Sequence, residues 1–473
     1  MSLMDNIPLD GTVQEIPQQS TPLCEKCSEI DFDAIDSFIR SEGLGQDGYV
    51  IRYLESLSPE CALCAFFKSW LHRNGEHEAY KNRTRWRDTY SVRVLDGHRP
   101  HDNENFFEPL LAQKPCLRMR MTESGPGYSF PRDIESNVVM LKRASFEGLL
   151  AQSIANPKVN YERIKRLLRS CRDGKHEACT KNPSSPPDGL RVIDCKSNEV
   201  ILLLKNTEYI TLSYVWGLEE GTPTCESNKL PQKLPKVISD SIALSKSLGF
   251  RYLWIDRYCI PQHDEAQKMA QIQKMGDIYA ASFLTIIAAA GDGPHHGLPG
   301  VGTTPREPPL VTTVGPYVLI YTDSPRKRIQ SSKWATRGWT YQEGCMSTRR
   351  LVFTAEQAYF QCQSMHAFET TDLPSWPIVY QNPYGKLDEN LFHQDQFSFA
   401  FPNQVDGSLV HSHIEFFFSR DLFFDEDALN ALAAGYHVIT FGTLLGDPHR
   451  SHTPPLLSIV VLGRMETKAF YGI

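Results

Sequence analysis

The sequence predicts an α/β fold for the central part of the chain, with a mostly parallel sheet covered by helices. Strand-like and helix-like segments alternate from residue 209 to residue 291. The third strand-like run, FLTIIAAAG, is apolar throughout, as expected of a strand that is buried on both faces. Together these observations favour parallel strands joined by right-handed helical crossovers.

Four consecutive segments build the first half of this sheet. LRVIDC and VILLLK predict a short hairpin, which leads into the strand YITLSYVWG at residues 209–217. LPKVISDSIALSKSLGF predicts a helix, because Ile238 and Ile242 share one face and Gly249 stands where a helix would end. RYLWID is expected to be the next strand.

A second helix is expected over DEAQKMAQIQKMGDIYA, before the apolar strand FLTIIAAAG. Met269, Met275 and Tyr279 share one face of that helix, and Asp264 precedes it, where acidic residues favour a helix start. The order then changes to a strand, YVLIYTD, and a helix-like turn, KWATRGWTYQEGCM. RRLVFTAEQAYFQC predicts a hairpin that turns near Ala355.

Proline and serine cluster in TKNPSSPPDG, which predicts a linker between two domains. The segment before it carries paired cysteines and strand-like runs such as TYSVRVL and NVVMLKR, so a mixed α+β domain is expected there. Near the other end, SRDLFFDEDALNALAAG predicts a mostly helical C-terminal extension. The predicted division is a disordered leader at 1–20, an N-terminal Cys-rich domain at 21–180, an α/β domain at 190–365 and the extension at 366–473.

The composition of the 473 residues excludes several classes of protein. Hydrophobic residues make up 41% of the chain, which is typical of a folded protein. The net charge is -7, from 49 basic and 56 acidic residues, so no nucleic-acid partner is expected. No signal peptide or membrane-spanning run is recognisable. A cytoplasmic protein is expected, in which the 12 cysteines stay mostly reduced.

The strands of the predicted sheet end in residues that suit a binding site. Trp216 and Gly217 end the first strand, and Asp256 and Arg257 follow the second. The carboxyl ends of parallel strands meet at one edge of a sheet, where α/β proteins bind ligands. An equally open interpretation makes Gly217 a turn residue and Asp256 a helix or turn cap.

Three blocks of the chain resemble a known family, the fungal heterokaryon-incompatibility (HET) domain. The blocks are YITLSYVWG (209–217), LGFRYLWIDRYCIPQHDEAQKMAQIQKMGDIYAASFLTIIAAAG (248–291) and RGWTYQEGCMSTRRLVFTAEQAYFQC (337–362). Their length and order make the resemblance specific. It implies a HET domain at residues 190–365 and a role in non-self recognition, as an effector of programmed cell death after unlike hyphae fuse.

The HET fold is similar in layout to the TIR signalling domain, a five-stranded flavodoxin-like sheet that cleaves NAD in several members. The catalytic glutamate of those enzymes lies in a helical Trp-Cys-x-x-Glu motif. Trp339 and Glu343 have the same spacing here, with Thr340 in place of the cysteine. The resemblance therefore implies an NAD glycohydrolase with Glu343 as its catalytic carboxylate. A carboxylate beside the ribose can stabilise the oxocarbenium-like cation that forms as nicotinamide leaves.

The residues expected to bind the substrate lie on the strand ends and on the same helix. They are Ser213, Tyr214, Trp216, Gly217, Asp256, Arg257 and Trp339. An alternative interprets Glu343 as a helix-surface acid paired to Arg337 or Arg349.

A second function class stays open, in which the domain is a non-enzymatic, self-associating adaptor that signals through protein partners. The sequence contains neither a Walker-type phosphate loop nor a GxGxxG motif after a strand. An NTPase or a dehydrogenase is therefore not expected.

Two Cys-x-x-Cys pairs in the N-terminal segment offer four thiolate ligands, Cys24, Cys27, Cys61 and Cys64. Zinc prefers tetrahedral thiolate sites, so these cysteines are candidate ligands of a structural zinc ion. The alternative is that Cys61 and Cys64 are small apolar residues of the core helix CALCAFFKSWL.

A second group of possible metal ligands precedes the linker. Cys171, His176 and Cys179 are close in the sequence, but three ligands do not complete a tetrahedral site. This group could bind a metal only with help from a more distant ligand, such as Cys195.

Overall fold

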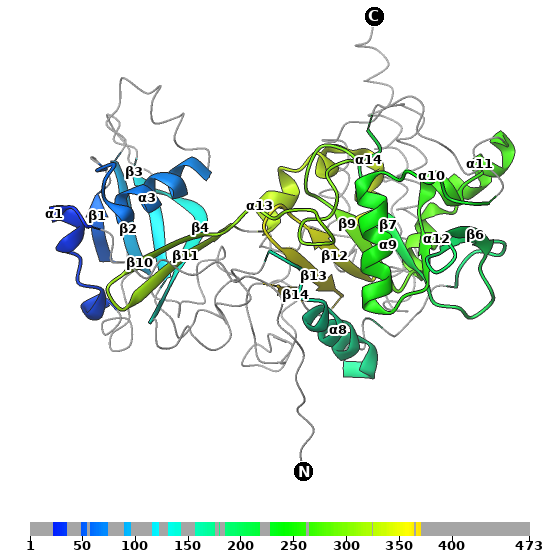
Figure 1. Ribbon diagram of the computed structural model, residues 1–473, viewed down its shortest axis with the longest axis horizontal. Coiled ribbons are helices and arrows are strands. Elements are labelled where there is room, and N and C mark those ends of the chain that lie inside the picture. The colour runs from blue at the N-terminus through cyan, green and yellow to red at the C-terminus, as the bar shows by residue number, and fades with distance from the viewer. Residues whose placement is uncertain are drawn as a thin grey trace, which may run out of the picture.

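The computed structural model of the chain describes two sheets, which lie side by side in Figure 1 with helices packed against each. The described residues are 22–35, 49–53, 57–73, 89–95, 116–122, 131–142, 157–175, 179, 185–217, 228–261, 264–323, 325–363 and 366–369. The predicted leader at 1–20 and all but the first few residues of the predicted helical extension at 366–473 lie outside this set. Within it, no helix has the length and apolar character needed to cross a membrane.

The larger sheet has eight strands in the order β14-β13-β12-β9-β7-β8-β5-β6. These strands are β5 (Arg191–Asp194), β6 (Glu199–Leu202), β7 (Ile210–Ser213), β8 (Tyr252–Trp254), β9 (Leu284–Ala288), β12 (Arg349–Phe353), β13 (Ala358–Cys362) and β14 (His366–Phe368). Strands β8, β7, β9 and β12 run parallel, whereas the strands at both ends of the sheet pair antiparallel. The predicted α/β class and the parallel centre are confirmed, as a mixed sheet.

Strand β7 lies in the middle of the parallel part. The chain leaves β7 for β8 on one side and then crosses to β9 on the other, so the direction of winding reverses between β7 and β9. All residues of β7 and β9 are buried, which explains why β9 has no polar face. The predicted strand 209–217 is too long, because the chain leaves the ladder after Ser213 and its next residues contact side chains of other elements.

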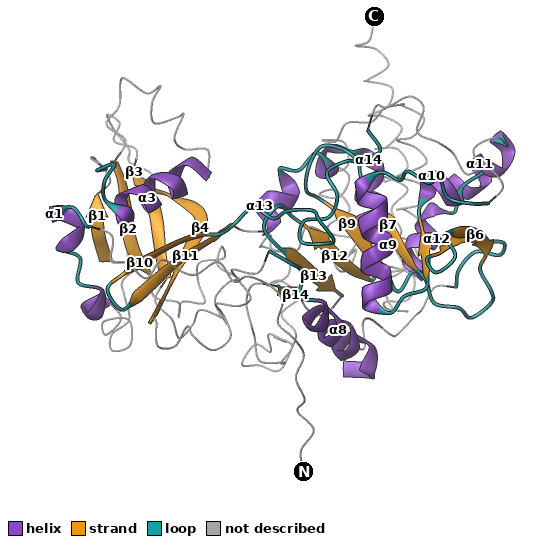
Figure 2. Ribbon diagram, viewed as in Figure 1, coloured by secondary structure: helices purple, strands orange, loops and turns teal. Residues whose placement is uncertain are grey.

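Helices connect the strands of the larger sheet and pack against it (Figure 2). They are α8 (Tyr161–Ser170), α9 (Lys236–Leu248), α10 (Asp256–Cys259), α11 (Glu265–Ile272), α12 (Met275–Ala281), α13 (Pro325–Gln330) and α14 (Gly338–Met346). A π-helical turn, η1, covers Cys171–Lys175, and a 3-10 turn, η3, covers Trp334–Thr336. The predicted end of α9 is confirmed, since Gly249 follows it with a left-handed φ of 91°. Helices α12 and α14 pack against each other, and α14 also contacts β7.

The single helix predicted over DEAQKMAQIQKMGDIYA is instead two helices, α11 and α12. Asp264 caps the first, because its carboxylate accepts a hydrogen bond from the backbone N–H of Gln267 at 3.0 Å. Met269 on α11 is 40% exposed, whereas Tyr279 on α12 is 1% exposed. The break between the helices allows α12 to bury its apolar face while α11 stays on the surface.

The smaller sheet has six strands in the order β1-β2-β3-β4-β11-β10. These strands are β1 (Tyr49–Tyr53), β2 (Thr89–Leu95), β3 (Cys116–Thr122), β4 (Pro131–Lys142), β10 (Leu310–Val314) and β11 (Tyr317–Asp323), all paired antiparallel. Strand β11 pairs with β4, from Tyr317 opposite Lys142 to Asp323 opposite Ser136. Residues 190–365 therefore contribute strands to both sheets, because β10 and β11 belong to the smaller one. The predicted division into consecutive domains did not include this exchange.

The helices α1 (Glu25–Ser28) and α3 (Ala62–Arg73) share a core with the smaller sheet. Trp70 of α3 is fully buried and its ring lies 6.1 Å from the ring of Tyr321 on β11. Phe67 and Leu319 belong to the same core. The late hairpin β10–β11 is thus needed to complete the core that α3 begins.

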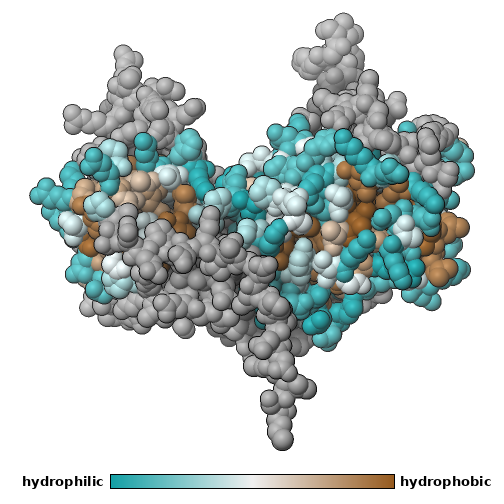
Figure 3. Space-filling model, in the orientation of Figure 1, coloured by the Kyte–Doolittle hydropathy of each residue, from teal (hydrophilic) through white to brown (hydrophobic). Residues whose placement is uncertain are grey.

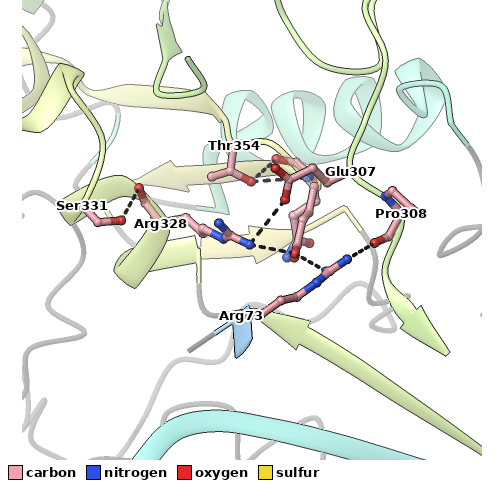
Figure 4. A network of polar contacts seen from close by, with 8 residues as sticks. Arg73, Glu307, Pro308, Arg328, Ser331 and Thr354 are labelled. Atoms are coloured by element: carbon pink, nitrogen blue, oxygen red, sulfur yellow. Dashed lines mark hydrogen bonds and ion pairs between the residues drawn. The ribbon is translucent and has the colours of Figure 1, made fainter. Parts of the chain in front are cut away.

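A network of charged side chains connects the two sheets (Figure 4). Arg73, at the end of α3, donates to Glu356 and to the Pro308 carbonyl, each at 2.8 Å. Glu356 lies in the turn between β12 and β13, which falls where the sequence predicted it. Arg328 of α13 contacts the same carboxylate at 3.2 Å and Glu307 at 3.4 Å. Glu356, in the larger sheet, is therefore bound by Arg73 of α3, which packs on the smaller sheet, and by Arg328 of α13. These contacts form the junction between the two sheets.

Most of the described surface seen in Figure 3 is hydrophilic. An apolar area is visible at the end of the molecule where Figure 1 places β6. Leu202 and Leu204, at the end of β6 and just after it, are 64% and 71% exposed. Strand β6 is also the last strand of its sheet, and residues 228–230 cover its outer edge: Val200 donates its backbone N–H to the Asn228 carbonyl, and Leu230 donates to the Asn198 carbonyl.

Candidate functional site

The carboxyl ends of β7, β8 and β9 lie at the same edge of the larger sheet, because these strands run parallel in adjacent positions. Ser213 is the last residue of β7. Asp256 begins α10 just after β8, and α14 carries Glu343 over β7. Three segments that are distant in the sequence therefore meet above the centre of the sheet, next to the point where its winding reverses.

Glu343 is buried, with 5% of its surface exposed, and faces the sheet. The Ser213 hydroxyl donates a hydrogen bond to its carboxylate. The indole N–H of Trp334 donates in turn to the Ser213 oxygen at 2.7 Å. The alternative in which Glu343 is a surface acid is wrong, since the helix presents it to the interior. The hydroxyl in a buried strand is explained as the central member of this chain of hydrogen bonds.

Trp334 rather than Trp339 joins this chain of hydrogen bonds. Trp334 is fully buried in η3, and its carbonyl accepts a hydrogen bond from the Thr340 hydroxyl at 2.6 Å. Trp339 is half-buried and packs against the main hydrophobic core. The Trp-to-Glu spacing did not identify Trp334, because it counted positions along α14 and Trp334 precedes that helix.

A second group of side chains surrounds Asp256. The carboxylate accepts a hydrogen bond from the indole N–H of Trp216 at 2.7 Å and another from the Arg257 backbone N–H at 2.7 Å. The guanidinium of Arg257 lies 4.9 Å from the centre of the Trp216 ring, a cation–π geometry. The predicted binding residues Trp216, Asp256 and Arg257 are thus in mutual contact. The alternative in which Asp256 caps a helix is wrong, because Asp256 is the first residue of α10 and Ile255 holds the N-cap position.

The remaining predicted residues of β7 have different roles. Tyr214 is 3% exposed, and its hydroxyl has no hydrogen-bond partner among the described residues. Its carbonyl accepts a hydrogen bond from Arg337 at 3.3 Å. Gly217 has a φ of 78°, and a Cβ there would lie 3.0 Å from Pro294. Backbone conformation and close packing therefore account for Gly217, whereas the unpaired Tyr214 hydroxyl requires a polar neighbour that the described residues do not supply.

The two carboxylates influence each other electrostatically. Burial and, to a smaller extent, the negative charge of Asp256 raise the pKa of Glu343 to about 7, against the opposing effects of Ser213, Arg337 and Tyr279. Burial also raises the pKa of Asp256 to about 6, although hydrogen bonds from Arg257 and Trp216 oppose this. Two acids with pKa values near neutrality at the strand ends are typical of a chemical site rather than of a solvated surface.

Tyr279 and Arg337 are members of the site that the sequence did not assign to it. The Tyr279 hydroxyl donates to the Leu212 carbonyl at 3.2 Å and lies close enough to the Glu343 carboxylate to lower its pKa. Burial and the charge of Glu343 raise the pKa of this tyrosine well above its usual value. The helical periodicity identified Tyr279 only as a core residue, because an aromatic ring on an apolar face gives no sign of where its hydroxyl points.

The four cysteines of the N-terminal segment come together at the starts of α1 and α3. Their Sγ atoms all lie within 4.8 Å of one another, and the Cys64 Sγ lies 3.6 Å from both the Cys24 and the Cys27 Sγ. Zinc–sulfur bonds of about 2.3 Å in a tetrahedral site would place sulfurs about 3.8 Å apart. The donor set and its spacing therefore fit a zinc ion, and the same cysteines also line the core of the smaller sheet.

The thiols of this group differ in acidity. Burial alone would raise the pKa of the Cys61 thiol, but hydrogen bonds from backbone N–H groups and neighbouring thiols lower it to about 6. Burial raises the pKa of the Cys64 thiol. Backbone N–H groups at a helix start favour a thiolate, which is the form that binds metal.

The second group of possible metal ligands, around Cys171 and Cys179, has Cys362 as its third member in the structure. Cys171 and Cys179 lie close to Cys362, at the end of β13, and the three Sγ atoms are within 4.8 Å of one another. Cys195 is not part of the group, and His176 lies outside the described residues.

Comparisons with known proteins bear on the same region of the chain. Residues 209–343 match the family described as Heterokaryon incompatibility protein (HET). Heterokaryon incompatibility protein 6, OR allele, from Neurospora crassa is 32% identical to this chain over 95 residues. That match covers 17% of this chain and 14% of the relative, so the chain spans only a small part of the relative's length. No solved structure matches the chain. The residues matched to the family extend from β7 to Glu343 and include Asp256.

Proposed function

We propose that this chain, whose residues 209–343 match the HET family, is an effector of heterokaryon incompatibility that causes programmed cell death by cleaving NAD. The observation that carries the proposal is the buried Glu343, hydrogen-bonded to Ser213 at the carboxyl end of β7 and electrostatically coupled to Asp256. The order β8-β7-β9-β12 of the parallel strands supports it further. Counted in chain order this is 2-1-3-4, the flavodoxin-like arrangement that binds ligands where the winding reverses.

In the proposed reaction, the bond between nicotinamide and ribose breaks and its electron pair leaves with nicotinamide. Positive charge then develops on the ribose, and the ionised Glu343 carboxylate stabilises it. Water adds to the ribose carbon and releases a proton. Ser213 holds the carboxylate in place through its hydrogen bond, and the Tyr279 hydroxyl lies beside it.

Other side chains of the site suit the rest of a dinucleotide. The Trp216 ring, fixed by Asp256 and Arg257, offers an aromatic surface for a base or for nicotinamide. Arg257 and Arg337 supply positive charge for the pyrophosphate. The Tyr214 hydroxyl, buried without a partner among the described residues, is placed to contact a bound polar group.

Expression of the chain in fungal cells tests this function. We expect the wild-type chain to lower both cellular NAD and viability, and Glu343→Gln to lower neither, because glutamine keeps the shape of the side chain without its charge. Glu162→Gln is the matched control, since Glu162 is an exposed acid with 71% of its side chain accessible. Loss of viability with unchanged NAD would reject the enzymatic function.

A second function, that of a non-enzymatic adaptor, is supported by the two exposed leucines at β6. Leu202 and Leu204 offer an apolar surface that suits association with a second copy of the chain. If the adaptor function is correct, Leu204→Lys will abolish killing while Glu343→Gln kills normally. If the enzymatic proposal is correct, Glu343→Gln will abolish the loss of NAD, whereas Leu204→Lys will not.

We also propose that Cys24, Cys27, Cys61 and Cys64 bind a structural zinc ion. Cys64→Ser is expected to reduce the zinc content of the purified chain by about one equivalent. It should also lower the stability of the smaller sheet, because metal binding and folding are coupled. A zinc content unchanged by Cys64→Ser would reject the site.

A further inference from the structure

A second thiol cluster lies on the larger sheet, away from the carboxyl ends of the parallel strands, where Glu343 of α14 is found. Cys171 begins the π-helical turn η1 that follows α8, and Cys362 is the last residue of β13. Cys179 completes the cluster, and the three Sγ atoms lie within 4.8 Å of one another. Cys171 and Cys362 are buried, and Cys179 is half-buried. Single π-helical turns inside helical segments are frequent at functional sites.

The cluster is next to a buried positive charge. Arg349 is the residue opposite Cys362 in the β12–β13 ladder and is 7% exposed. Its Nε donates to the Cys171 Sγ at 3.1 Å. Its other nitrogens donate to the carbonyls of Phe283 and Cys179 at 3.3 and 3.2 Å.

No carboxylate pairs with Arg349 within the part of the chain that the structure describes. A buried guanidinium without a counter-charge is unfavourable, so this place suits a bound group that carries net negative charge. The fully buried Arg350 lies near Cys179 and Cys362 and adds positive charge to the same surroundings.

We propose that Cys171, Cys179 and Cys362 bind a zinc ion, with Arg349 as the hydrogen-bonding partner of the cluster. Binding releases one proton from each thiol, and one Zn²⁺ with three thiolates carries a net charge of -1, opposite in sign to the adjacent guanidinium of Arg349. A water molecule completes the tetrahedral coordination as the fourth ligand. Thiolates favour zinc among the common divalent ions. A hydrogen bond from outside the coordination sphere to a ligand atom is a usual feature of such sites.

The bound ion would hold α8 and η1, which precede the proline-rich linker, against the far end of the larger sheet. In Figure 1, α8 lies beside β13 and β14. Asn160, the residue that caps α8, donates its backbone N–H to Glu369 just after β14 at 2.5 Å. The metal would therefore reinforce a contact between two segments that are far apart in the sequence.

Native mass spectrometry of the full chain purified with zinc present tests the proposal. We expect Cys362→Ser to lose one zinc ion relative to the wild type, and Cys195→Ser, which changes a buried cysteine outside both clusters, to lose none. Cys64→Ser reports on the N-terminal site separately, so failure of one site does not imply failure of the other. The same zinc count in Cys362→Ser and the wild type would overturn the proposal.

A measurement on the wild-type chain covers the case in which Cys362→Ser does not fold. Alkylation followed by peptide mass spectrometry is expected to leave Cys171, Cys179 and Cys362 unmodified until a strong chelator removes the metal. Equal alkylation with and without the chelator would overturn the site. A disulfide within the cluster in freshly purified protein would overturn it as well.

Discussion

The Ser213 hydroxyl donates a hydrogen bond to the Glu343 carboxylate, which joins the end of β7 to α14 across 130 positions of sequence. Trp334 donates to the same hydroxyl at 2.7 Å, so the serine proton is directed at the carboxylate. Tyr279 approaches the carboxylate from α12. The acid is thus oriented by Ser213, which Trp334 orients in turn, and a side chain held by its neighbours in this way suits a catalytic carboxylate.

Ser213→Ala is expected to destabilise the chain. The substitution leaves the buried Trp334 N–H and the Glu343 carboxylate without the hydroxyl that both use, which costs about 1–3 kcal/mol. Urea-induced unfolding of the full chain measures this change. Ser241→Ala is the matched control, because the Ser241 hydroxyl only donates to the Val237 carbonyl within α9. Equal losses of stability in the two variants would show that the hydrogen bonds of Ser213 with Glu343 and Trp334 do not stabilise the fold.

The raised pKa of Glu343 predicts how stability depends on pH. The folded chain binds the Glu343 proton up to about pH 7, whereas the unfolded chain releases it near 4.5. Stability therefore falls as pH rises from about 4.5 to 7, by about 3 kcal/mol from this group alone. Asp256 contributes in the same direction between 3.8 and about 6.

Glu343→Gln separates this contribution from that of other groups. Unfolding free energies measured across this pH range should decrease less steeply for the variant than for the wild type. Identical slopes for the two proteins would mean that Glu343 titrates normally in the folded chain.

Glu356→Gln is expected to weaken the junction between the two sheets. It removes the negative charge that Arg73 and Arg328 share, in a carboxylate whose side chain is only 7% exposed. The expected loss is about 2 kcal/mol, the scale of a hydrogen bond to a charged group. Glu162→Gln, which alters an exposed pair with Lys165, should leave stability nearly unchanged. A loss no larger than that of this control, in urea unfolding, would exclude a structural role for the network.

The elements of the parallel sheet could be predicted because their local signals were strong. The apolar run of β9, Gly249 at the end of α9 and the turn before Ala358 each reflect short-range physics. The partner of β11 could not be predicted in this way. Its sequence indicates a buried strand, but pairing with β4 rather than with β9 is decided by long-range packing against α3.

The candidate site was predictable in part for the same reason. Parallel strands bring their carboxyl ends together, so the proximity of Ser213 and Asp256 followed from topology. The choice of Trp334 as the partner of Ser213 depends on how η3 turns into α14, which no short pattern encodes. Cys362 was missed as a cluster member because its neighbours Cys171 and Cys179 are distant in the sequence.

The release of nicotinamide from NAD by the purified full chain tests the central claim most directly. At a pH above 7, where Glu343 is ionised, we expect release by the wild type and a reduction of about a hundredfold or more in Glu343→Gln. The wild-type rate should rise as pH increases through about 7, following the pKa of Glu343. No release by the wild type, even when the chain is clustered on a support, or equal release by Glu343→Gln, would contradict the account.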